Sequence, residues 1–171
     1  MLIRSAKPED AEFIGSIRVA AWQAAYRGFM PDTYLALASL DPGANLDELR
    51  AALRAENPPF TLRIAETEGQ PIAFSILGKP RYNADQSIAE LWALNVHPTH
   101  WRKGAGQQLV RQVLLDAKEQ KFVSVELWCI QGNLAAQRLY EICGFVPNSQ
   151  VRTTSSLTGY PLHELAYTYA L

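Results

Sequence analysis

Cysteine is scarce in this sequence, and the only two, Cys129 and Cys143, form no Cys-x-x-Cys pair. A disulfide framework or a cysteine-based zinc site needs more cysteines at closer spacing, so both are disfavoured and a reducing compartment is indicated. The sequence also lacks any apolar run near the ~18 residues that a membrane span requires, and its N-terminus lacks the apolar stretch of a signal peptide. We therefore expect a cytoplasmic protein without a membrane partner.

A charge excess of either sign is absent as well. Lys and Arg total 16 against 17 Asp and Glu, which gives a formal net charge of -1. Proteins that bind nucleic acid usually carry a basic excess or a basic stripe, so no nucleic-acid partner is expected. Hydrophobic residues make up 48% of the 171 residues, and no repeat or Gly/Ser linker divides them. These values predict one folded domain over residues 1–171.

A cluster of metal ligands is also absent from the sequence. His97 and His100 stand at a predicted strand end and turn, where they share no helix face, and no third ligand is evident. A structural or catalytic zinc site needs at least three protein ligands, so no metal is expected. The two cysteines are most simply small core residues at apolar positions.

The periodicity of the apolar residues predicts the secondary structure. It indicates strands over residues 2–6, 60–67, 71–78, 87–96, 123–129, 145–153 and 162–170. Helical spacing, with Pro, Asn and Gly near the ends, indicates helices that begin at Pro8 and that cover 32–39, 45–55, 105–120 and 133–144. This order predicts an α/β (α+β) domain with a mixed central sheet of about seven strands, flanked by helices.

The strongest chemical signal is the turn Trp101-Arg102-Lys103-Gly104-Ala105-Gly106, between a predicted strand and a predicted helix. The first N–H groups of a helix lack internal partners, and the helix dipole adds partial positive charge, which favours a bound anion. Glycine lets a backbone approach an anion closely, and Arg102 and Lys103 add full charges. The spacing fits neither a dinucleotide fingerprint nor a P-loop. The alternative is a plain strand-to-helix turn with solvated basic residues.

The segment from Leu94 to Pro98, followed by that turn, resembles the cofactor-binding motif of the GNAT N-acetyltransferase superfamily. The family pattern is Gln/Arg-x-x-Gly-x-Gly/Ala; Gly104 and Gly106 match it, while Trp101 stands at the Gln/Arg position. A second segment, residues 133–145, resembles the family's Asn-x-x-Ala-x-x-(Leu/Phe)-Tyr-x-x-x-Gly-Phe. Residues 21–28, with Pro31 and Leu35 after them, resemble a common opening of the family.

The resemblance covers nearly the whole chain and implies the GNAT fold, a mixed sheet splayed near the strand that carries Leu94 to Val96, with acyl-CoA inserted in the splay. It implies acetyl-CoA as the acyl donor. A backbone N–H of that strand would polarise the thioester carbonyl. The residues that the resemblance and the turn predict to bind the cofactor are Leu94, Asn95, Val96, Trp101, Arg102, Lys103, Gly104, Ala105, Gly106, Gln107, Asn133 and Ala136.

Acetyl transfer to an amine needs a base for the ammonium and an acid for the departing thiolate. Glu90 is predicted as the base, because it stands fourteen positions before Gly104, where the histone-acetylating branch of the family has its catalytic glutamate. Its alternative is a strand-end carboxylate that is either solvated or paired with a base such as Arg81. Tyr140 matches the family tyrosine that faces the cofactor sulfur and is predicted as the acid; its alternative is a core aromatic. Asn133 is expected to cap its helix and to bind the pantetheine arm.

The acceptor side is less defined by sequence. Trp22 and Tyr26 stand four apart on the first helix, where they form either part of the core or an aromatic wall of the acceptor pocket. Loops at 26–46, 79–86 and 148–161 are expected to supply most of that pocket. We predict direct acetyl transfer from acetyl-CoA to an unknown primary amine of a small molecule or peptide. The alternative is a non-catalytic acyl-CoA-binding sensor. A homodimer through the C-terminal strands is a further expectation.

Overall fold

The structure, a computed structural model, describes residues 1–40, 45–81, 83–155 and 159–171. Its strands are β1 (Leu2–Ser5), β2 (Phe60–Thr67), β3 (Gln70–Gly78), β4 (Ile88–Val96), β5 (Ser124–Ile130), β6 (Val146–Thr154) and β7 (Leu162–Ala170). Its helices are α1 (Ala11–Ala25), α2 (Asp32–Leu40), α3 (Leu46–Arg54), α4 (Ala105–Glu119) and α5 (Leu134–Ile142), with short 3-10 turns at Pro8–Asp10 and Pro98–His100. Every predicted strand and helix is present, with bounds that differ by a few residues.

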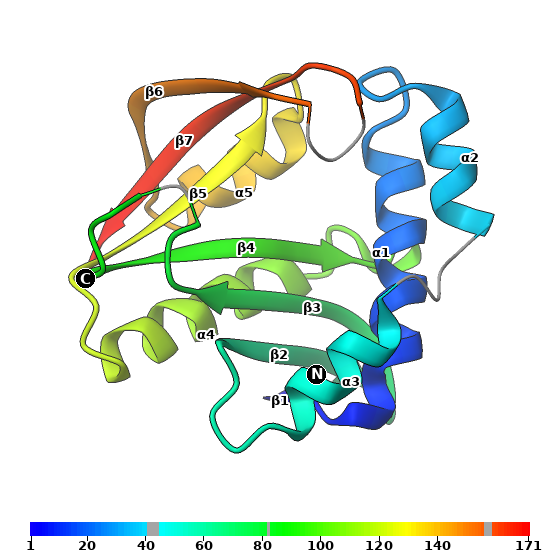
Figure 1. The fold of residues 1–171 in the computed structure, drawn as a ribbon, viewed down its shortest axis with the longest axis horizontal. Coiled ribbons are helices and arrows are strands. Elements are labelled where there is room, and N and C mark those ends of the chain that lie inside the picture. The colour runs from blue at the N-terminus through cyan, green and yellow to red at the C-terminus, as the bar shows by residue number, and fades with distance from the viewer. Residues whose placement is uncertain (41–44, 82, 156–158) are drawn as a thin grey trace.

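The strands form one mixed sheet in the order β1-β2-β3-β4-β5-β7-β6 (Figure 1). β4 and β5 run parallel, and the other neighbouring pairs are antiparallel. This arrangement confirms the predicted fold class. The first helix differs in one detail: Pro8–Asp10 is a separate 3-10 turn. The Asp10 carboxylate accepts the Lys7 N–H at 2.7 Å and so closes that turn before α1 begins.

β4 and β5 are hydrogen-bonded neighbours over only part of their length. Their parallel register ends at Leu91 opposite Leu127, although both strands continue beyond these residues. In the pairing of β4 with β3, Trp92 is an extra residue between consecutive partners, which makes it a β-bulge. A bulge bends its strand and increases the local twist, which gives a physical reason for the divergence of β4 from β5. The sheet is therefore splayed beside Leu94–Val96.

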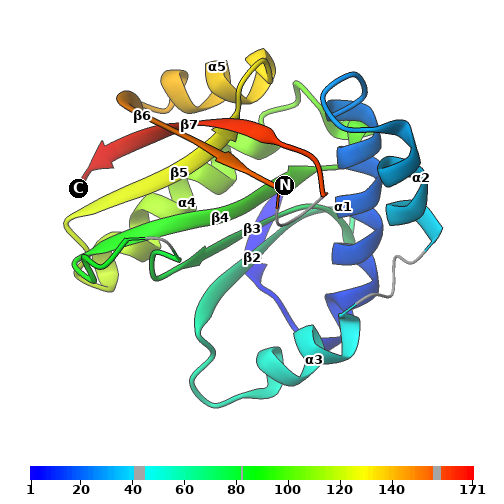
Figure 2. The same ribbon diagram turned by 45° about the horizontal axis from the view of Figure 1, so that its top comes forward.

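Helices cover the two faces of the sheet unequally (Figure 2). α4 and α5 pack on one face, where the largest core cluster joins them to β4, β5 and β7. α1 and α3 pack on the other face, against a smaller cluster from β2 and β3. On that second face, no helix among the described residues lies over the middle of β5 and β7 (Figure 1). The sheet therefore keeps one partly uncovered face beside the splay.

A buried ion pair fixes α4, the helix that follows the phosphate turn, to β2. The Asp116 carboxylate is 3% exposed and accepts from Arg63 Nε at 2.8 Å and from Arg63 Nη2 at 2.6 Å. Asp116→Ala leaves that guanidinium unpaired, so we expect the free energy of unfolding in urea to fall by about 3 kcal/mol or more. Leu115→Ala, at an exposed and uncharged site of the same helix, should change it by about 0.5 kcal/mol or less. Equal, small effects would show that the ion pair adds no net stability.

Candidate active site

The splay presents backbone groups of β4 that are not used by the sheet. The His97 N–H donates to the Ile72 carbonyl of β3 at 2.8 Å. Successive residues of a strand direct their backbone groups to opposite edges, so the N–H groups of Leu94 and Val96 point away from β3 and into the splay. The sequence predicted that an amide of this strand faces the thioester but could not say which one. The register selects Leu94 and Val96 and assigns Asn95 to the β3 side.

The turn after β4 has the backbone conformation of an anion site. Arg102 has φ 59° and Gly104 has φ 87°, both in the left-handed region, which directs nearby N–H groups into one concavity. The first intrahelical hydrogen bond of α4 runs from the Gln108 N–H to the Gly104 carbonyl at 3.1 Å. The N–H groups of Ala105, Gly106 and Gln107 precede it and have no partner inside the helix. A left-handed non-glycine residue costs about 1–2 kcal/mol, and such strain concentrates at ligand sites.

Gly106 has a packing role that the sequence analysis did not identify. A Cβ atom at this position would lie 3.0 Å from Leu139 Cδ2 and 3.8 Å from Val96 Cγ2. By contrast, a Cβ atom at Gly104 would meet nothing within 4 Å. The two glycines therefore differ: Gly104 supplies the left-handed turn, whereas Gly106 allows α4 to approach α5 closely.

Tyr140 lies on α5, in the core cluster on the sheet face that α4 and α5 cover. Its side chain is buried, with the ring 6.0 Å from Phe145 and 6.4 Å from Tyr167 between centroids. Burial raises the pKa of the Tyr140 hydroxyl well above its ordinary value of ~10, and the nearby Cys129 raises it further. Cys129 lies in the part of β5 that has left β4. The Tyr140 hydroxyl is therefore protonated at neutral pH and lies close to the diverged strand.

Asn133 and Tyr26 join the start of α5 to the end of α1. The Asn133 side-chain oxygen accepts the Ala136 N–H at 3.2 Å, which confirms Asn133 as the helix N-cap. The Asn133 side chain also hydrogen-bonds to the Tyr26 hydroxyl and lowers its pKa, whereas burial, the larger cause, raises that pKa to about 12. The Asn133 backbone is engaged as well, since its N–H donates to the Ile130 carbonyl at 3.0 Å and its carbonyl accepts the Gln137 N–H at 3.0 Å. The contact of Asn133 with pantetheine stays a prediction. Tyr26 interacts electrostatically with Cys129 as well, so it reaches the same end of β5.

The acceptor-side aromatics are packed together. The Trp22 ring lies edge-on to Tyr26 at 5.9 Å and tilted to Tyr34 at 6.5 Å between centroids. These rings pack against a small cluster of Met30, Leu35 and Leu162. Both interpretations of Trp22 and Tyr26 from the sequence, core packing and acceptor wall, are compatible with this position.

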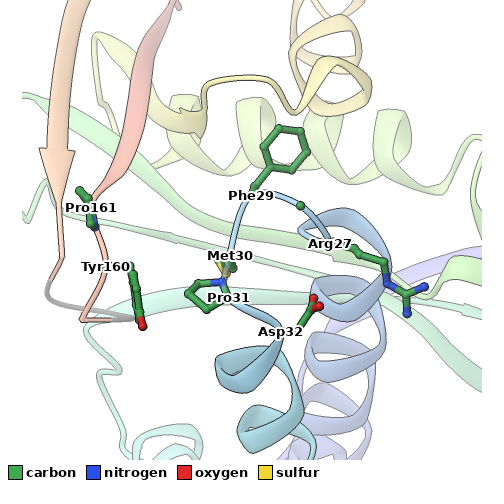
Figure 3. Close-up of a pocket in the computed structure, with 8 residues that line it drawn as sticks. Arg27, Phe29, Met30, Pro31, Asp32, Tyr160 and Pro161 are labelled. Carbon is green, nitrogen blue, oxygen red and sulfur yellow. The ribbon is translucent and has the colours of Figure 1, made fainter.

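A hollow of about 570 Å³ opens beside these aromatics (Figure 3). The turn between α1 and α2 forms one side, and Tyr160 and Pro161, just before β7, form the other. Phe29 points from this turn toward the loop before α5. A Cβ atom on Gly132, in that loop, would lie 2.6 Å from Phe29 Cε1, so the ring packs directly against the Gly132 backbone. Glu90 and Tyr140 do not line the hollow. Of the loops expected to form the acceptor pocket, residues 41–44, 82 and 156–158 lie outside the described residues.

Both carboxylate oxygens of Glu90 are bound by Arg81. Oε1 accepts from Arg81 Nε at 3.0 Å and from Nη2 at 2.6 Å, and Oε2 accepts the Arg81 backbone N–H at 2.7 Å. Glu90 is 1% exposed, and its partner's side chain is 43% exposed. The structure thus contains the ion pair that the sequence offered as the alternative. A catalytic role for Glu90 stays a prediction.

The two histidines of the turn form local contacts. His97 Nδ1 lies 2.8 Å from Thr99 Oγ1, and the His97 and His100 rings lie 6.3 Å apart between centroids. Across the described residues, no group of three or more His, Cys, Asp or Glu side chains could hold a metal ion. In that part of the chain, no helix is both long and apolar enough to cross a membrane.

Comparison with known proteins decides the family. The profile of the acetyltransferase (GNAT) family matches residues 9–145, well over half of the chain. The chain belongs to the GNAT family. It is 24% identical to the uncharacterized N-acetyltransferase YuaI of Bacillus subtilis over 131 residues, which cover 77% of this chain and 72% of YuaI.

Solved structures have the same fold. The PaiA N-acetyltransferase of Thermoplasma acidophilum, in complex with coenzyme A, superposes with a TM-score of 0.77 at 18% identity, over 99% of this chain and 98% of PaiA. YncA of Salmonella typhimurium, with its cofactor acetyl-CoA, superposes with a TM-score of 0.70 at 19% identity, over 100% of this chain and 94% of YncA. These likenesses confirm the GNAT fold.

The departure of this GNAT chain from the family motif has a structural explanation. Trp101 stands where the family has Gln or Arg, and its indole Nε1 donates to the Val96 carbonyl at 2.7 Å. That carbonyl points into the splay, as the Val96 N–H does, so the indole ties the phosphate turn to the end of β4. The ring is 38% exposed, so it also forms part of the surface beside the turn.

Sequence reasoning missed a set of polar residues on the uncovered face of the sheet. Val125, Leu127 and Cys129 of β5 pack toward α4 and α5, so the alternating Glu126 and Trp128 project to the opposite face. Glu164 of β7 and Arg152 of β6 complete this group. We call Glu126, Trp128, Arg152 and Glu164 the open-face group. The sequence does contain a signal for this group: polar residues alternate with apolar ones in β5. A buried-strand carboxylate was interpreted from the sequence only at Glu90.

Proposed function

We propose that this GNAT chain is an acetyl-CoA-dependent N-acetyltransferase that moves an acetyl group to a primary amine by direct transfer in a ternary complex. The observation that carries the proposal is the continuity of the splay with the phosphate turn. The N–H groups of Leu94 and Val96 face the splay, and the same strand leads into the left-handed turn at Arg102 and Gly104. The coenzyme A in PaiA and the acetyl-CoA in YncA, two proteins of the same fold, support this cofactor.

We assign each part of the cofactor to the groups of the splay and the phosphate turn by charge and polarity. The pyrophosphate lies against the N–H groups of Gly104 to Gln107, with Arg102 and Lys103 beside them. The pantetheine arm follows the free edge of β4, where the Leu94 and Val96 amides bind its polar groups, and it passes Asn133 and Ala136 at the start of α5. The Leu94 N–H, deepest in the splay of the two, polarises the thioester carbonyl.

Tyr140 is assigned the role of acid for the departing thiolate. Burial raises the pKa of its phenol, which makes it a weaker acid than a solvated tyrosine. The same apolar surroundings disfavour the thiolate, so the pKa of the leaving thiol rises too. Since both pKa values rise, the difference between the phenol and the thiol, which drives the proton transfer, changes less than either value alone. Trp22 and Tyr26 are assigned to the wall of the acceptor site, because they lie between the hollow and the end of β5.

The acceptor is a primary amine of a small molecule or a peptide N-terminus. A homodimer through the C-terminal strands stays a prediction; β6 is an edge strand of the sheet, with Val146 60% and Val151 72% exposed. Edges of this kind readily pair with a second strand.

The test is calorimetric titration with acetyl-CoA, followed by thiol-release assays over a panel of primary amines and peptides. We expect micromolar binding and release of one thiol for each amine acetylated. Binding without release for any amine would favour the sensor function and overturn the enzymatic one. Absence of acetyl-CoA binding would overturn both.

A further inference from the structure

Two carboxylates face each other across the last paired residues before the splay. Glu90 of β4 and Glu126 of β5 are partners in the parallel register, one position before Leu91 and Leu127, where that register ends. Both side chains project to the face away from α4 and α5, because their neighbours on each side pack in the core cluster. Two acidic side chains therefore lie at the closed end of the splay, on the side opposite Tyr140.

Two arginines lie around these carboxylates, and each of them pairs with a carboxylate other than Glu126. Arg81 pairs with Glu90 at 2.6 Å, and Arg152 pairs with Glu164 at 2.6 Å while its guanidinium stacks 4.1 Å over the Trp128 ring. Glu126 is 7% exposed, and within the described ranges it takes part in no salt bridge. Three carboxylates thus share two guanidinium groups, which leaves one negative charge without a matching cation.

We propose that Glu126 is the carboxylate that binds the ammonium group of the acceptor and removes its proton. The proposal rests on the acetyltransferase function proposed above and names the chemistry of its acceptor site. An ammonium ion supplies the cation that the group of Glu90, Arg81, Arg152, Glu164 and Glu126 lacks. A buried carboxylate is stabilised strongly by such a partner. The acceptor therefore approaches over the open-face group, while the cofactor lies in the splay.

The surroundings of Glu126 suit a base at neutral pH. Burial raises its pKa above the ordinary value, and the negative charge of Glu90 across the strand pair raises it further. The Trp128 side chain hydrogen-bonds to the carboxylate and the Arg152 charge lies near it, and both lower the pKa, with smaller effect than burial. A carboxylate whose pKa is moved toward the working pH is a better general base than a solvated one. Glu90, by contrast, already has a cation as its partner, since Arg81 binds both of its carboxylate oxygens.

The protons balance in this arrangement. The acceptor ammonium gives one proton to Glu126, and the neutral nitrogen attacks the thioester carbonyl to form the C–N bond. As the C–S bond breaks, Tyr140 protonates the thiolate, and the second nitrogen proton returns Tyr140 to its phenol form. Glu126 then releases its proton to water. The net change is ammonium plus thioester to amide, thiol and one free proton.

Glu126→Gln tests the proposal, because the amide keeps the shape and the acceptor for the Trp128 contact but cannot take a proton. The pH profile of kcat/KM is measured with the amine of the panel that wild type acetylates fastest. We expect kcat/KM at neutral pH to fall about 10²- to 10⁴-fold, with loss of the acidic limb of the profile and an unchanged Kd for acetyl-CoA. Glu126→Asp should restore part of the rate. Glu119→Gln, at an exposed site of α4, removes the same charge and should change nothing.

The outcomes separate this proposal from the broader one. Thiol release by wild type, with an unaltered pH profile in Glu126→Gln, would overturn the role of Glu126 and leave the enzyme assignment intact. Loss of the acidic limb in Glu90→Gln instead would transfer the role of base to Glu90. If Glu126→Gln does not fold, ¹³C NMR of the wild-type side-chain carboxyls replaces it. The Glu126 signal must then titrate above the range of a solvated glutamate and shift when ethylammonium is added, or the proposal is wrong.

Discussion

Replacing Tyr140 by Phe should lower kcat by about 10²- to 10⁴-fold, the range by which a positioned acid accelerates a proton transfer. The substitution removes one buried hydroxyl and keeps the ring, whose contacts with Phe145 and Tyr167 hold α5 against the sheet. We therefore expect the Kd for acetyl-CoA and the thermal midpoint to change little. Steady-state thiol release and calorimetric titration on the same preparation measure the two quantities.

Tyr167→Phe is the matched control. Tyr167 belongs to the same core cluster, is also buried and also lies near Cys129, but its hydroxyl donates to the Glu141 carboxylate of α5 at 3.4 Å, a partner that Tyr140 lacks within the described residues. Its loss should leave kcat unchanged. An unchanged kcat in Tyr140→Phe, or an equal loss in both variants, would remove Tyr140 from the reaction.

The pH dependence gives an independent check on Tyr140. Because burial raises the pKa of its phenol, the acid form persists below that raised pKa and is lost only as the pH rises through it. The wild-type rate should therefore show no alkaline fall from Tyr140 at or below pH ~10, the ordinary pKa of a phenol. A fall near neutral pH that disappears in Tyr140→Phe would contradict this.

The sequence predicted the fold closely because local signals and tertiary structure agree. Alternating apolar residues at 60–67 and 71–78 became β2 and β3, and Asn133 caps α5 as its residue type suggests. The splay itself followed only from the family resemblance. Its physical source, the extra residue Trp92 in β4, depends on the register with β3, and no local pattern in the sequence specifies that register.

The candidate site was predictable where it follows the backbone and not where it depends on side-chain partners. The left-handed Gly104 and the start of α4 could be read from residue types. The sequence could not decide between the ion pair of Glu90 with Arg81 and a catalytic role for Glu90. The reason is that Arg81 lies in the loop before β4, and no sequence pattern predicts the path of that loop. Glu126 was missed for the same reason: it lies opposite Glu90 only because β4 and β5 pair, and the two residues are 36 positions apart in the sequence (90 to 126).

Gly104→Val should weaken acetyl-CoA binding by about 10- to 100-fold. Gly104 has φ 87°, and a β-branched side chain is severely strained there, so the turn must shift. A shift removes one or more N–H contacts to the pyrophosphate, and each hydrogen bond to a charged group contributes about 1.5–3 kcal/mol. Calorimetric titration measures the loss of affinity, and the thermal midpoint without cofactor measures the strain.

Gly69→Val separates these two effects. Gly69, between β2 and β3, has φ 76°, and like Gly104 it has nothing within 4 Å of the position of a Cβ atom. The same substitution therefore imposes similar backbone strain at a turn remote from the splay. Both variants should lose stability, and only Gly104→Val should lose affinity. Equal affinities in the two variants would mean that the turn after β4 does not hold the pyrophosphate, whereas a loss confined to Gly104→Val ties cofactor binding to the conformation of that turn.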